Sequence, residues 1–143
     1  MLGRKDYTKD ELENARKAVA QQLAAYKKLV KAIDAATSDP KVAAALEAFE
    51  PILFNNMVMV LDRYFVHRIR NVTGKDSNPL NEVELLTDAL IDNGGLLRGN
   101  NVIKYAPDQS VLGLEIGDRI KLTAVEFERL AKAFLAEIEA KFV

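Results

Sequence analysis

The chain has 143 residues, of which 49% are hydrophobic and 29% charged, and its formal net charge is -1. This balance is typical of a folded globular protein, and the length predicts a single helical domain over residues 1–143. A net charge so close to zero disfavours binding to nucleic acid or to acidic membranes. The absence of cysteine excludes disulfides, thiolate metal sites and thiol nucleophiles, and it is compatible with a reducing compartment.

Apolar residues that recur at three- and four-residue steps predict a mainly α protein, a bundle of about four helices. The first helix is predicted over residues 8–36, with Thr8 and Glu11 forming a capping box at its start. The second helix is predicted over residues 40–72. Pro51 falls inside it and is expected to kink or break it.

The third helix is predicted to start at Asn78-Pro79, an N-cap followed by a first-turn proline, and to close at residues 93–95. The apolar period then changes to strict alternation around residues 117–119. This change predicts a small antiparallel β-hairpin between the third and fourth helices, with Ile116 facing Ile120 and a short extra strand at residues 102–105. The alternative is an α+β domain in which the hairpin joins a wider sheet.

The last helix follows a second capping box, formed by Thr123 and Glu126. The longest apolar stretch, residues 52–69, is interrupted by polar side chains and is too short to predict a membrane span. We therefore expect a cytoplasmic protein without a membrane segment.

Polar residues inside this apolar stretch give the strongest hint of a site. On a continuous helix, Asn56, Arg63, His67 and Arg70 share one face because they are spaced by seven, four and three residues. Asn55 and Asp62 form a neighbouring stripe, and basic side chains gathered here would suit a carboxylate or a phosphate. The simpler interpretation is a solvated helix face. The candidate ligand-binding residues are Asn55, Asn56, Asp62, Arg63, His67, Arg70 and Lys75.

His67 is the only histidine, so a metal site built from several histidines is excluded within one chain, and we predict no metal and no cofactor. An enzyme hypothesis uses His67 as general base, supported by Asp62 or Arg63, and it requires a closed cavity around His67.

Asp62 is surrounded in sequence by apolar residues, so its carboxylate is expected to be partly buried. A buried charge needs a partner, and Arg98 or Arg119 is the first expectation.

Four further sequence segments form a recognisable set: Phe54-Asn55-Asn56, residues 61–68, Gly74-Lys75-Asp76 and residues 78–83. In these segments the chain resembles a family of small uncharacterised bacterial proteins. The resemblance implies no activity, cofactor or catalytic residue.

Several predicted helices carry wide apolar stripes. Together these stripes present more apolar surface than three partner elements can readily cover. The sequence therefore predicts a cytosolic binding or interaction module, homodimeric, with a polar pocket for a small anionic ligand as the candidate site.

Overall fold

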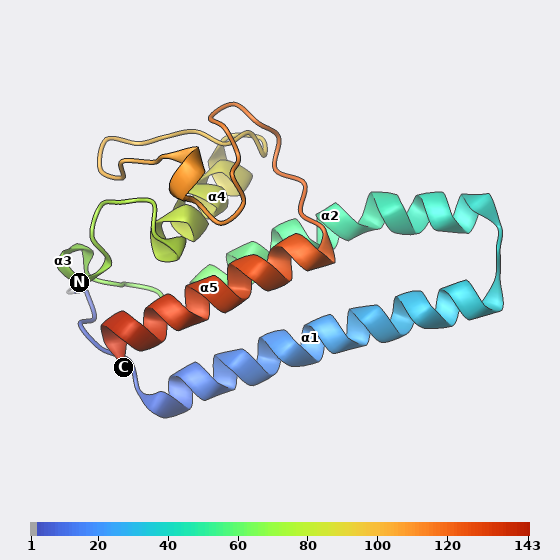
Figure 1. The fold of residues 1–143 in the computed structure, drawn as a ribbon, viewed down its shortest axis with the longest axis horizontal. Coiled ribbons are helices and arrows are strands. Elements are labelled where there is room, and N and C mark those ends of the chain that lie inside the picture. The colour runs from blue at the N-terminus through green and yellow to red at the C-terminus, as the bar shows by residue number, and fades with distance from the viewer. Residues whose placement is uncertain (1–2) are drawn as a thin grey trace.

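The computed structural model describes residues 3–143, which form a mainly helical bundle (Figure 1). The mainly α fold class predicted from the sequence is confirmed. The elements are α1 (Lys9–Ala36), α2 (Pro40–Arg63), α3 (Arg70–Thr73), α4 (Pro79–Asp92), the short 3₁₀ turn η1 (Pro107–Gln109) and α5 (Ala124–Phe142).

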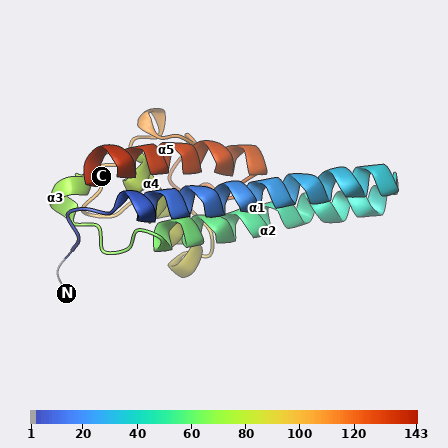
Figure 2. The same ribbon diagram turned by 90° about the horizontal axis from the view of Figure 1, so that it is seen from below.

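Helices α1 and α2 form a long antiparallel hairpin, and α5 lies along one side of it (Figures 1 and 2). Helix α4 packs against both α2 and α5. The core is built around aromatic rings: Phe54 of α2 lies 4.9 Å from Tyr26 of α1 and 5.5 Å from Phe127 of α5, measured between ring centroids. Three helices therefore meet at one ring, which is the kind of burial that dominates core stability.

The helix starts follow the capping residues of the sequence. Thr8 and Thr123 each form a complete capping box, Asp39 accepts from the Lys41 amide, and Asn78 accepts from two amides at the start of α4. Each cap satisfies backbone donors that the first helical turn leaves free. Helix α2 continues through Pro51, so the break considered there does not occur.

The predicted extent of the second helix, residues 40–72, is wrong. Helix α2 ends at Arg63, and the chain turns before the four-residue helix α3. His67 lies in this turn with φ 63°, a left-handed conformation uncommon for a residue other than glycine. The face that was to join Asn56 to Arg70 on one helix therefore does not exist.

The N-terminal segment pairs with the turn that follows α2. The Arg4 amide donates to the His67 carbonyl at 2.6 Å, and the Ile69 amide donates to the Arg4 carbonyl at 3.1 Å. A Cβ on Gly3 would meet the backbone of Ile69 at 3.0 Å, so only glycine fits this approach without a shift. The turn thus exchanges helical hydrogen bonds for pairing with a segment more than 60 residues away in sequence.

The predicted β-hairpin and the α+β alternative are also wrong for the described residues, which contain only isolated bridges and no strand. The alternating segment pairs instead with the residues that follow α4. The Leu97 amide donates to the Asp118 carbonyl at 2.9 Å, and the Ile120 amide donates to the Gly95 carbonyl at 2.8 Å. Ile116, expected to face Ile120, is 53% exposed. The proposed strand at residues 102–105 is loop.

Candidate functional site

Asn55 connects α2 to the segment that precedes α5. Its side-chain amide donates to the Ile120 carbonyl at 2.8 Å, and its side-chain oxygen accepts from the Leu122 amide at 3.1 Å. Both hydrogen-bonding groups of the side chain are therefore used inside the chain. Asn55 therefore links α2 to the segment before α5.

Replacing Asn55 by alanine should lower the free energy of unfolding by about 2 kcal/mol. Two backbone groups would lose their partner, each at about 1 kcal/mol for a half-buried bond. Urea unfolding of Asn55→Ala measures this, and Asn14→Ala, at an exposed asparagine of α1 outside this contact, serves as the matched control. Equal effects at the two positions would contradict the role assigned to Asn55.

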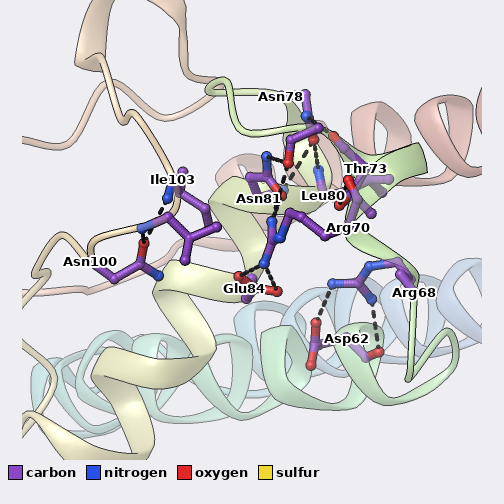
Figure 3. Close-up of polar contacts among 12 residues, drawn as sticks. Asp62, Arg68, Arg70, Thr73, Asn78, Leu80, Asn81, Glu84, Asn100 and Ile103 are labelled. Carbon is purple, nitrogen blue, oxygen red and sulfur yellow. Dashed lines mark hydrogen bonds and ion pairs between the residues drawn. The ribbon is translucent and has the colours of Figure 1, made fainter. Parts of the chain in front are cut away.

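Asp62 forms an ion pair with Arg68, in which Nη2 lies 2.8 Å from Oδ1 (Figure 3). The prediction that Asp62 is partly buried and bound to an arginine beyond its own helical turn is confirmed, since its side chain is 24% exposed and that of Arg68 7%. The expected partners were wrong. Arg98 pairs with Asp88, and the side chain of Arg119 donates to a backbone carbonyl.

Arg68 also closes the C-terminus of α2. Its Nη1 donates to the Phe65 carbonyl at 2.7 Å and to the Asp62 carbonyl at 3.4 Å, and its guanidinium stacks 5.3 Å from the Phe134 ring of α5. Cations are favourable at a helix C-terminus, where carbonyl groups lack helical partners. One buried side chain therefore ends the helix and joins it to α5.

Arg70 is tied to α4. Its guanidinium donates to the Asn81 side chain at 2.8 Å and to the Glu84 carboxylate at 2.7 and 3.0 Å (Figure 3). Asn81 is buried and holds the loop before α4 through the Asp76 carbonyl. Arg70 is therefore a structural link between α3 and α4.

The remaining four candidates, Asn56, Arg63, His67 and Lys75, are exposed. They lie on α2, in the turn after it and in the loop after α3, and no hydrogen bond between described residues joins any two of the seven candidates. His67 is exposed in the turn after α2, whereas the enzyme hypothesis required it to line a closed cavity. The described residues also contain no cluster of three metal-ligating side chains. The small-anion pocket stays a prediction.

Glu82 is a buried carboxylate that sequence reasoning missed. It is 2% exposed, and its two oxygens accept from the Val111 amide at 2.7 Å and the Leu112 amide at 3.0 Å. Burial raises the pKa of Glu82, and the two amides and the Arg129 guanidinium oppose that rise. In the sequence, Glu82 is simply an acidic residue in a first helical turn, so no local signal marks it. Its contacts indicate that it anchors the loop after α4.

An apolar groove of about 440 Å³ lies between α1 and α2 and was also missed. We call it the hairpin groove. Its floor is formed by the buried Tyr26 and Met57 and the half-buried Leu53. None of its lining residues is charged. Its exposed walls are Gln22, Ala25 and Leu29 from α1 and Phe49, Asn56 and Val60 from α2.

The hairpin groove lies on the side of α1 and α2 that faces away from α5. Helix α1 meets α5 through a different stripe, with Arg16 paired to Glu139 and Lys27 to Glu128. The end of the α1–α2 hairpin also projects beyond α5, as both views show (Figures 1 and 2). No described element therefore covers the groove, and large apolar side chains remain in solvent: Leu29 is 50% exposed, Phe49 45% and Val60 38%.

By its length and composition, helix α2 could cross a membrane, but these two properties alone are weak evidence for a membrane span. Only 22% of its most apolar stretch is buried within the chain. An apolar helix with so little burial needs either another surface or a lipid environment to cover it.

No family model, curated protein or solved structure matches this chain. The resemblance to small bacterial proteins therefore remains a prediction, and the function must be argued from the geometry.

Proposed function

We propose that the protein is a cytoplasmic interaction module that works as a homodimer. The observation that carries this proposal is the hairpin groove, an uncharged and exposed apolar surface in a chain that is 29% charged. Contiguous apolar patches of this kind mark interaction sites on soluble proteins. Covering them contributes about 25 cal/mol for each Å² of apolar surface removed from water.

The polar side chains of α2 argue against a membrane-spanning role for this helix. Glu50 accepts from the Ala124 amide at 2.7 Å, Asn55 binds the segment before α5, and Asp62 pairs with Arg68. These contacts would be lost if α2 left the bundle, and each group would then need a partner in lipid, where partners are scarce. Helix α2 therefore fits a protein environment better than a membrane.

Sedimentation velocity tests the proposal. At micromolar concentration the expected species has twice the 15.9 kDa mass of the chain and dissociates on dilution. A single species of monomer mass throughout the micromolar range would remove the homodimer.

A further inference from the structure

We infer that the hairpin groove is the surface on which a second copy of this chain docks, face to face, so that the two α1–α2 hairpins form a four-helix arrangement. This inference rests on the proposed homodimer and names its interface. A two-fold symmetric pair buries the same patch on both copies, so a single self-complementary face is sufficient. Long helices with apolar stripes pack in this way in bundles and coiled coils.

The size of the face suits a second copy. The exposed side of α1 over residues 18–36 and of α2 over residues 45–63 is about 28 Å long, at about 1.5 Å per residue. Two helices whose axes lie about 10 Å apart make a face about 20 Å wide. Each chain thus offers about 600 Å², and two chains about 1,200 Å², which reaches the lower limit for a stable interface.

Asn56 supplies the second argument for a copy of the same chain. It is the exposed polar residue of the groove wall on α2, with the apolar Phe49, Leu53 and Val60 as its fellow lining residues. A covered amide needs both a donor and an acceptor, and another Asn56 across a two-fold axis offers both. A single asparagine in an apolar helical seam is also a known means of setting register and the number of strands.

The charges around the tip of the hairpin disfavour an anionic lipid as the occupant. Over residues 27–47 the sequence has four lysines and three acidic residues, so the tip carries a basic excess of only one charge. Proteins that bind acidic membranes through such helices depend on a cluster of basic residues. Because the basic and acidic charges of the tip nearly cancel, apolar contact is the main attraction at this face. A second copy of the groove provides such contact.

Substitution on the groove wall tests the interface. Phe49→Glu should weaken dimerisation at least about 30-fold, the loss expected at a central apolar contact. Val125→Glu is the matched control, because Val125 is 66% exposed on α5, outside the groove. Sedimentation velocity gives the dissociation constants, and far-UV circular dichroism checks that both variants are folded.

Cysteine cross-linking tests the same interface without disrupting it, and the natural chain contributes no cysteine of its own. Under mild oxidation Asn56→Cys should form a disulfide-linked dimer, because a disulfide requires Cβ atoms about 4 Å apart. Ala136→Cys, exposed on α5, should remain monomeric on a denaturing gel.

Each outcome is decisive. A dimer that persists in Phe49→Glu and does not cross-link through Asn56→Cys would overturn this interface but leave the homodimer standing. A monomeric wild type would overturn both. A monomeric wild type that floats with neutral phosphatidylcholine vesicles, and no longer does so as Phe49→Glu, would replace the second copy with lipid.

Discussion

Replacing Asp62 by alanine should lower the free energy of unfolding by about 3 kcal/mol, the lower end of the range for breaking a buried ion pair. The lower end applies because the Asp62 side chain is 24% exposed, whereas that of Arg68 is only 7% exposed. The loss arises mainly at Arg68, whose guanidinium would stay buried against the Phe134 ring without its counter-charge. Arg68 would keep its bonds to the carbonyls of residues 62 and 65, which soften the loss without removing it.

Chemical denaturation of Asp62→Ala measures this loss, and the chain offers a matched control. Asp88 pairs with Arg98 at 3.1 Å, but both side chains are about 40% exposed. Asp88→Ala should therefore cost less than about 1 kcal/mol, as exposed pairs do. Asp62→Asn should lie between the two, because its amide oxygen can still accept from Arg68. A loss below about 0.5 kcal/mol in Asp62→Ala would show that the pair is not a structural link.

The Asp62 case illustrates which features a sequence can predict. The carboxylate had to find a cationic partner because its neighbours in sequence are apolar, and that requirement is local. The identity of the partner depends on where the chain turns after Arg63. Arg68 becomes the partner only because the turn at His67 brings it back over the end of α2. The periodic apolar pattern continued past the turn and concealed it.

The helix starts were predictable for the same local reason. A capping residue and its acceptor lie within three residues of each other, so Thr8 with Glu11 and Thr123 with Glu126 can be recognised in the sequence. The false β-hairpin shows the opposite case. Alternation around residues 117–119 is typical of a strand pair. The backbone groups of Asp118 and Ile120 instead form hydrogen bonds with Leu97 and Gly95, whose position depends on where α4 ends.

The candidate site was predicted least well. Steps of seven, four and three residues align side chains only on an uninterrupted helix, and the turn at His67 removed that condition. The hairpin groove carried a weaker signal, since Leu29 and Phe49 belong to apolar stripes that a core would also use. Their exposure follows from their position on the side of the α1–α2 hairpin that faces away from α5, which packs on another stripe of α1.

Replacing Glu82 by alanine should lower the free energy of unfolding by about 3 kcal/mol. The variant would leave the half-buried Val111 and Leu112 amides without an acceptor, at about 1–3 kcal/mol each. Removing the carboxylate also removes the cost of burying its charge, and this gain offsets part of the loss in stability. Glu82→Gln keeps one acceptor in place and should be milder than Glu82→Ala. Urea unfolding ranks the three proteins, and the amides of residues 111 and 112 should exchange faster with solvent in Glu82→Ala.

The pH dependence of the free energy of unfolding shows whether burial or hydrogen bonding has the larger effect on the pKa of Glu82. Burial raises the pKa of Glu82 in the folded chain above its usual 4.5. Folding therefore favours the protonated side chain. The stability that the protonated side chain contributes is complete below about pH 4.5 and is lost as pH rises through the pKa of Glu82 in the folded chain. The stability advantage of wild type over Glu82→Gln should accordingly shrink as pH rises above about 4.5, while exposed Glu115→Gln should differ from wild type by less than about 0.5 kcal/mol. An advantage that grows with pH would mean that the two amides and Arg129 outweigh burial, so that the folded chain prefers the carboxylate.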